Sequence, residues 1–204
     1  MNKKYELTDE TIEINGAKLY RIRALRFVKV ANRGDLGGFI EKEKNLSHDG
    51  DCWVFGNACV YGDAIVFGNA MIYDNAKVYG NAIVSGNAMI CDNAQVYGHA
   101  IISDDASVSE NAQVYEHASI YGDAKIYGNA HVYGNAFITD TAEVYGKAHV
   151  CGETALDGNV QIYGDLKLIN GYFYHTKKKT DPIEKIENDE EIETLCVDPK
   201  VEKI

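Results

Sequence analysis

The stretch AKVYGNAIVSGNAMICDNAQVYG, from Ala76 to Gly98, repeats the same pattern every six residues. Each unit reads alanine, a variable residue, an aliphatic residue, another variable residue and then a pair such as Gly-Asn or Asp-Asn. Its first four residues alternate between apolar and variable positions, as in an extended strand with one buried side. Glycine, asparagine and aspartate tolerate positive φ and form tight turns. The unit therefore predicts a short strand followed by a two-residue corner.

The six-residue pattern extends along most of the chain. Every sixth residue from Val54 to Leu168 is Val, Ile or Leu, and every sixth residue from Ala58 to Ala148 is alanine. An α-helix does not fit, because six residues are not a whole number of turns and the repeated glycines would destabilise it. Strands that turn at every sixth residue, with the same positions inward, close into a three-sided parallel β-helix of about 18 residues per coil. The spacing alone leaves the hand of the coil open.

The repeat, written as aliphatic, x, x, x, small, x, resembles the hexapeptide repeat of the trimeric LpxA-like superfamily. Its Tyr-Gly-Asn-Ala units and the leader segments LYRIRALR (19–26) and GDLGGFIEKEKNLS (34–47) are similar to the YdcK-like group of single-chain left-handed β-helices, and to repeat proteins of phages and prophages. The resemblance covers about residues 19 to 170 and implies an all-β, left-handed parallel β-helix. For activity it implies little, because a shared fold does not fix a function.

Three segments are expected along the chain. Residues 1–35 contain two alternating runs around Asn15-Gly16, a strong hairpin signal, and predict a β-hairpin that caps the first coil. Residues 36–172 form the β-helix, and residues 173–204 form a small capping tail, either a hairpin or a short helix. In the last coil the alanine positions are taken by the bulkier residues Thr154, Val160, Leu166 and Tyr172. We therefore expect this coil to be wider than the others.

Charge and composition narrow the class of partner. The net charge is -11, and residues 54–168 carry four lysines and no arginine against 13 acidic residues. Because binding to a phosphate backbone depends on many cationic contacts, we expect no nucleic-acid partner. No apolar run is long enough to span a membrane, and five scattered cysteines without metal-type spacing are typical of free thiols. We expect a cytoplasmic protein with no membrane contact and no metal site.

Sorting the outward positions by the 18-residue step places five tyrosines in one column. Such a column is an aromatic ladder that stabilises neighbouring strands, or a recognition strip, since tyrosine offers contact area at low entropic cost. The candidate binding residues are Tyr61, Tyr79, Tyr97, Tyr115 and Tyr133.

A second face carries mostly apolar residues outward. Monomeric proteins seldom expose a long apolar strip, so its burial against another copy, in a dimer or trimer, is the economical explanation. The candidate interface residues are Ile65, Phe67, Ile83, Ile101, Tyr121 and Phe137.

These patterns support three functional hypotheses. The first is a non-enzymatic scaffold that binds itself or a protein partner through its faces, and a phage-borne accessory or counter-defence protein is one example. The second follows from the superfamily resemblance, which implies an acyltransferase that uses acetyl-CoA, with His131 or His149 as the base between subunits. Unbroken repeats disfavour it, because they leave no loop to shape a pocket. The third is a protein that sequesters a small nucleotide-like ligand. The first needs no cofactor.

Overall fold

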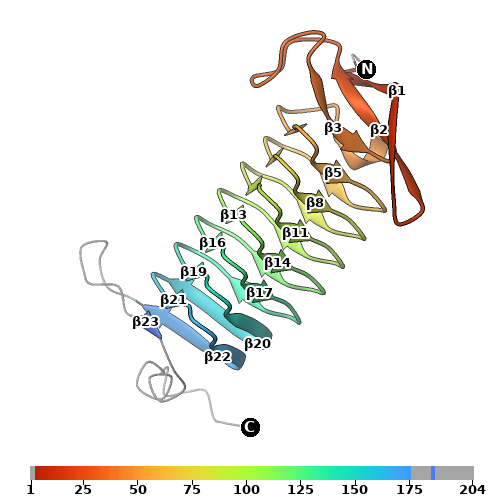
Figure 1. Ribbon diagram of the computed structural model, residues 1–204. Coiled ribbons are helices and arrows are strands. Elements are labelled where there is room, and N and C mark those ends of the chain that lie inside the picture. Colours follow the sequence, from red (N-terminus) through yellow and green to blue (C-terminus); the bar gives the residue numbers. More distant parts are fainter. Residues whose placement is uncertain (1–2, 176–184, 187–204) are drawn as a thin grey trace.

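The computed structural model describes residues 3–175 and 185–186, and it shows an elongated rod of stacked parallel coils with a strand-rich cap at its N-terminal end (Figure 1). Three stacks of short strands run along the rod, and each strand pairs with the strand 18 residues further along the chain. The fold is therefore an all-β parallel solenoid with 18-residue coils, as predicted. Three stacks fit a three-sided coil, and the left-handed sense stays a prediction.

The first stack forms the face that carries the tyrosine column, and we call it the tyrosine face. Its backbone ladder is regular, with the Lys77 amide donating to the Ala94 carbonyl at 2.9 Å and the Tyr79 amide to the Val96 carbonyl at 3.0 Å. Its strands are β5 (Cys59–Val60), β8 (Lys77–Val78), β11 (Gln95–Val96), β14 (Gln113–Val114), β17 (His131–Val132) and β20 (His149–Gly158).

The other two stacks form an apolar face and a mixed face. The apolar face consists of β6 (Ile65–Val66), β9 (Ile83–Val84), β12 (Ile101–Ile102), β15 (Ser119–Ile120) and β18 (Phe137–Ile138), and it ends on β20. The mixed face consists of β4 (Trp53–Val54), β7 (Met71–Ile72), β10 (Met89–Ile90), β13 (Ser107–Val108), β16 (Lys125–Ile126), β19 (Glu143–Val144), β21 (Gln161–Ile162) and β23 (Lys185–Ile186).

The core is the interior of the coil. All aliphatic positions of the six-residue pattern from Val54 to Ile162 have no exposed surface, and Leu168 is nearly as buried. The alanines from Ala58 to Ala148 are equally buried, because the backbone at each corner leaves no room for a larger side chain. The sequence prediction of the inward set is confirmed.

The corners require positive φ, and glycine supplies it at most of them. At Gly86, for example, an added Cβ would lie 2.5 Å from the amide nitrogen of Asp104 in the next coil. The remaining corners use acidic residues with φ between 53° and 59°, namely Asp74, Asp92, Asp104, Glu110, Glu116 and Asp140.

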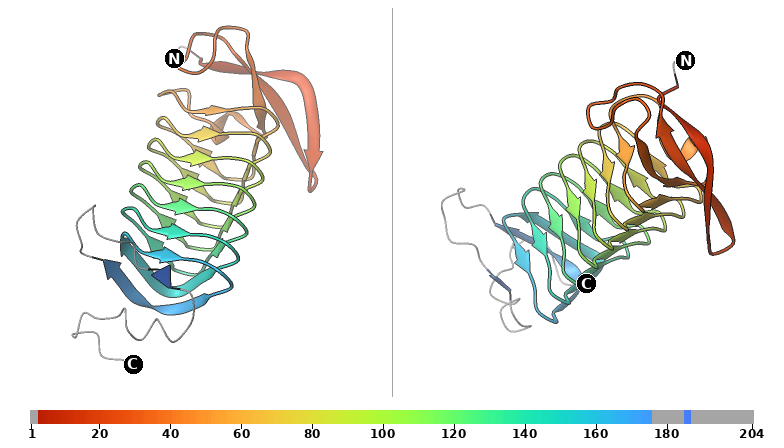
Figure 2. Two further views of the ribbon diagram at one scale, coloured as in Figure 1. Left: turned by 60° about the vertical axis from the view of Figure 1, so that its left-hand side comes forward. Right: turned by 45° about the horizontal axis from the view of Figure 1, so that its top comes forward.

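The cap consists of the antiparallel strands β1 (Tyr5–Ile14) and β2 (Ala17–Ala24), followed by β3 (Leu36–Ile40) and a short 3-10 helix, η1 (Glu43–Asn45). The hairpin turn falls at Asn15-Gly16, as predicted, with φ of 50° and 81°. Strand β3 pairs in parallel with β5, so the cap continues the sheet of the tyrosine face. Figure 2 shows the hairpin lying beside the first coils.

The last described coil differs from the prediction. Strand β22 (Lys167–His175) pairs with β20 at an offset of 18 residues at Val150↔Leu168, but of 17 residues at Leu156↔Phe173. One residue fewer at this corner turns Phe173 into the core and leaves Tyr172 43% exposed. The expectation that Tyr172 occupies the alanine column is therefore wrong. The predicted capping tail lies largely outside the described residues.

Candidate functional site

The five tyrosines of the tyrosine face form one continuous stack. Successive ring centroids are 5.0, 4.8, 4.9 and 4.9 Å apart from Tyr61 to Tyr133, and the ring planes differ by 5° or less. The rings cover each other's faces, so the ladder presents ring edges and hydroxyl groups to solvent. Offset or parallel stacking of this kind contributes on the order of 1 kcal/mol per pair beyond the buried area.

A neighbouring column of side chains orients the hydroxyl groups. The Tyr79 hydroxyl donates to Gln95 Oε1 at 3.3 Å, and the Tyr97 hydroxyl donates to Gln113 Oε1 at 3.2 Å, each time one coil further on. Burial, followed by the neighbouring tyrosines, raises the pKa of Tyr79 to about 12. The ladder is therefore a neutral, hydrogen-bonded surface at physiological pH.

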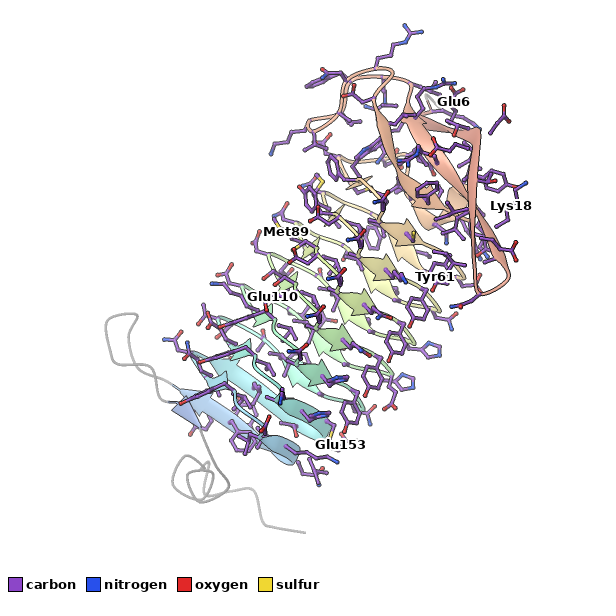
Figure 3. The ribbon with its side chains drawn as sticks, viewed as in Figure 1. Glu6, Lys18, Tyr61, Met89, Glu110 and Glu153 are labelled. Atoms are coloured by element: carbon purple, nitrogen blue, oxygen red, sulfur yellow. The ribbon has the colours of Figure 1, made fainter. Side chains whose placement is uncertain are left out.

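The two ends of the ladder differ in exposure. Tyr61 is only 7% exposed, because the hairpin packs Leu19 against a cluster that contains Phe39, Cys59 and Tyr61. Figure 3 shows Tyr61 on the side of the rod where the hairpin lies. The rungs that face solvent without this cover are Tyr97, Tyr115 and Tyr133. The sequence did not reveal the cover, since the six-residue pattern does not say which face the hairpin crosses.

The column beside the tyrosines, which carries Gln95 and Gln113, continues toward the C-terminal end with two histidines, His131 and His149. His131 stacks on His149 with 4.7 Å between ring centroids, and the edges of the same two rings meet Tyr115 and Tyr133. Burial, followed by His149, lowers the pKa of His131. Among the described residues no group of three or more His, Cys, Asp or Glu side chains is arranged to hold a metal ion. Both imidazoles therefore lie against the tyrosine ladder, and the use of either as a base between subunits stays a prediction.

The apolar face exposes its predicted residues to different degrees. Ile65, Phe67 and Phe137 are 40%, 42% and 44% exposed, which is high for large apolar side chains. Ile83 and Ile101 are half-buried and complete the row between Ile65 and Phe137, in register with the strand pairs. The half-buried Tyr121 lies over Phe137, with 5.6 Å between their ring centroids. Ser119 interrupts the row, and in the neighbouring column Ser85 and Ser103, hydrogen-bonded to each other at 3.1 Å, lie between Phe67 and Tyr121.

The acidic corner residues have a structural role that the sequence did not suggest. The carboxylates of Asp92, Asp104 and Glu116 each accept a hydrogen bond from the corner amide of the next coil, at 3.0, 3.2 and 2.9 Å. The stacked asparagines also pair between coils, as between Asn69 and Asn87 at 3.0 Å. These groups satisfy backbone and side-chain polar atoms and hold successive coils in register.

The N-terminal end of the rod holds a buried polar cluster that the sequence did not predict. Lys4 is fully buried, and its ammonium donates to the carbonyl of Cys52 at 2.8 Å. Tyr5, also fully buried, stacks on His48 at 4.4 Å and lies edge-on to Trp53. The sequence places a lysine and an aromatic residue where an alternating strand begins, but nothing in the spacing indicates that both side chains are buried.

Two further observations bear on the class of protein. No helix in residues 3–175 or 185–186 has the length and apolarity that a membrane crossing requires. The described cysteines, Cys52, Cys59, Cys91 and Cys151, are free thiols.

Comparison with known families agrees with this architecture. The family model for the YdcK β-solenoid repeat matches residues 76–92 and 94–110, two segments that begin one 18-residue coil apart. No curated protein matches the chain. The matched segments lie in the most regular part of the parallel coil, so the chain is a parallel β-solenoid that carries YdcK-type β-solenoid repeats.

Proposed function

We propose that this β-solenoid is a non-enzymatic binding protein that acts through its flat faces, and that the apolar face mediates its self-association. The observation that carries the proposal is the outward row of large apolar side chains on β6, β9, β12 and β18, which is exposed at Ile65 and Phe137 and half-buried at Ile83 and Ile101. Such a strip costs free energy when it faces water, and burial against a similar strip removes that cost at about 25 cal/mol per Å².

The regular coil makes the face suitable for this contact. Each step from β6 to β18 advances by 18 residues without an inserted loop, so the outward side chains form straight rows about 4.8 Å apart. Two such rows can interdigitate along their length, as side chains do between packed sheets. Because a two-fold pair uses the same surface twice, one strip is sufficient for a dimer.

The uncovered rungs of the tyrosine ladder provide a second surface, for a protein partner. Tyr97, Tyr115 and Tyr133 are held by stacking and, in the case of Tyr97, by Gln113, so they lose little side-chain entropy when a partner binds. The hairpin indicates the kind of contact, since it covers Tyr61 with aliphatic side chains.

Charge substitution on the apolar face tests the self-association. Ile83→Glu combined with Ile101→Glu places two carboxylates in the centre of the row, and we expect a monomer by size-exclusion chromatography with light scattering. The matched control, Ser107→Glu, adds a carboxylate at an equivalent outward position of the mixed face and should leave the assembly intact. If the double variant keeps the mass of the wild type, the apolar face is not the interface.

A further inference from the structure

The contact between Lys4 and Cys52 lies at the N-terminal end of the rod, where the cap meets the first coil. Both side chains are fully buried, and the Lys4 Nζ atom lies 3.1 Å from the Cys52 sulfur. The same ammonium also donates to the Cys52 carbonyl at 2.8 Å and reaches the Gly50 carbonyl at 3.5 Å. The amine is therefore fixed against the thiol by two backbone acceptors.

The partners of this lysine are unusual. A buried lysine is normally paired with a carboxylate, because an unpaired buried charge is costly. Within the described residues, Glu43 lies within ion-pair distance of Lys3 and His48, and Lys4 takes part in no ion pair. The thiol is otherwise surrounded by the carbonyl oxygens of Ser47, Asp49 and Val66 at 3.6 to 3.8 Å. Apart from the backbone, the amine is the group that the sulfur meets.

We propose that Lys4 and Cys52 form an oxidation-dependent covalent link, a sulfenamide bond between Nζ and Sγ. Peroxide first oxidises the thiol to a sulfenic acid and is itself reduced to water. While the segment is open, the Lys4 ammonium gives one proton to water and becomes a neutral amine. This amine attacks the sulfur, the S–O bond breaks, and hydroxide leaves with a second proton of the nitrogen as water. In total, R–SH, R′–NH2 and H2O2 give R–S–NH–R′ and two molecules of water. A thiol reductant reverses the link by attack at sulfur.

Access for the oxidant requires local opening at the chain end. Lys4 directly precedes β1, the edge strand of its sheet, and a strand that is paired on one side only opens more readily than the core. Burial raises the pKa of the Cys52 thiol, which Lys4 opposes, so oxidation should be slow and limited by this opening. When the segment closes again, the amine returns to within contact distance of the sulfur, and the effective concentration of the nucleophile becomes high.

Cys91 provides an internal comparison. It is half-exposed on the mixed face, and its sulfur lies 3.5 Å from the Asp92 carboxylate. Burial raises the pKa of this thiol, and the charged groups that raise it further, Asp92, Asp74 and Glu110, are all acidic. Its sulfenic acid has no comparable internal nucleophile, so oxidation there should continue to acids that keep the added oxygen. Cys52 should instead lose its oxygen as water.

The link would fasten the cap to the solenoid. It closes a loop from residue 4 to residue 52, which contains the hairpin, β3 and η1. A covalent loop of this size stabilises mainly by restricting the unfolded chain. The consequence is a cap whose attachment depends on redox conditions.

Peptide mapping of the full-length protein after treatment with hydrogen peroxide tests the inference. We expect a cross-linked peptide pair containing Lys4 and Cys52, about 2 Da lighter than the sum of its parts and separated again by dithiothreitol. The cross-linked protein should melt about 5 °C higher than the reduced protein.

Lys4→Arg serves as the control, because it keeps the positive charge and the long stem but is a far weaker nucleophile. Its Cys52 peptide should gain oxygen and react with dimedone. The wild-type map tests the idea even if this variant folds poorly. Absence of the Lys4–Cys52 peptide from the oxidised wild type, or equal oxygen uptake at Cys52 in both proteins, would overturn the inference.

Discussion

The carboxylate of Asp92 accepts a hydrogen bond from the backbone amide of Glu110, one coil further along the rod, at 3.0 Å. Asp92 has φ of 58°, a conformation that is costly for any residue with a Cβ atom. An acidic residue therefore offsets the cost of the corner with a bond that glycine cannot make. The hydrogen bond and the unfavourable φ make opposite contributions to stability at such a corner, and substitution can separate them.

Substitution of Glu116 separates them, because its carboxylate accepts the Gly134 amide at 2.9 Å and its φ is 58°. Glu116→Ala keeps the unfavourable φ and loses the bond, so the free energy of unfolding should fall by about 1 kcal/mol. Glu116→Gly loses the bond but relieves the backbone, and should stay within about 0.5 kcal/mol of the wild type. Urea denaturation measures both values. Equal losses in the two variants would show that the hydrogen bond does not contribute in this way.

The inward columns should tolerate neither loss nor gain of volume. Ile102→Ala leaves a cavity in the centre of the coil and should cost about 3 kcal/mol. Ala100→Leu forces a larger side chain against the neighbouring backbone and should cost at least about 2 kcal/mol. Ser107→Ala, at an outward position, should change the free energy of unfolding by less than about 0.5 kcal/mol. Thermal or chemical denaturation of the three variants checks the ranking, and a mild effect of Ala100→Leu would mean that the interior is less tightly packed.

The hairpin should shield Cys59, at the N-terminal end of the tyrosine face, from alkylating reagents. Leu19→Asp puts a charge into the cluster with Phe39, Cys59 and Tyr61, so the hairpin should detach from the sheet. Burial raises the pKa of Cys59 to about 11 and keeps this thiol unreactive. Its rate of alkylation should rise at least tenfold in the variant, and not in the exposed hairpin variant Thr11→Asp. An unchanged rate would show that the hairpin does not shield this cysteine.

Alkaline pH should weaken the tyrosine ladder. Burial raises the pKa of Tyr79 to about 12, against a value of 10.0 for the ordinary side chain. The folded protein therefore holds this proton more tightly than the unfolded chain. The stabilisation is complete below pH 10 and is lost as pH rises through about 12. The melting temperature should fall over this range, and the fall should be smaller in Tyr79→Phe. A melting temperature that stays constant up to pH 12 would contradict this assignment.

Much of the fold could be predicted because the six-residue pattern is both long and strict. Residues such as Val96 and Ala100 each report the same inward direction, and the Asn15-Gly16 turn carries its own local signal. Features that depend on contacts between distant segments could not be predicted. The burial of Lys4 and Tyr61 depends on where the N-terminal segment crosses the rod. The turned-in Phe173 depends on a one-residue deletion, which becomes visible only when strands are paired.

The roles of the two surfaces are less predictable than their positions. The pattern places Tyr97 and Phe137 outward, and the structure agrees for both. Outward placement does not distinguish a stabilising stack from a binding strip, because stacking of rings on adjacent strands is favourable in either case. Only the partner contact distinguishes them.

Surface footprinting at low and high protein concentration tests the central claim most directly, since it reports which face becomes buried. On association, modification of Phe67 and Phe137 on the apolar face should decrease several-fold. Met89, which is 44% exposed on the mixed face and is labelled in Figure 3, should remain unchanged. Protection of Met89 in place of the two phenylalanines, or equal modification of all three residues at both concentrations, would contradict self-association through the apolar face.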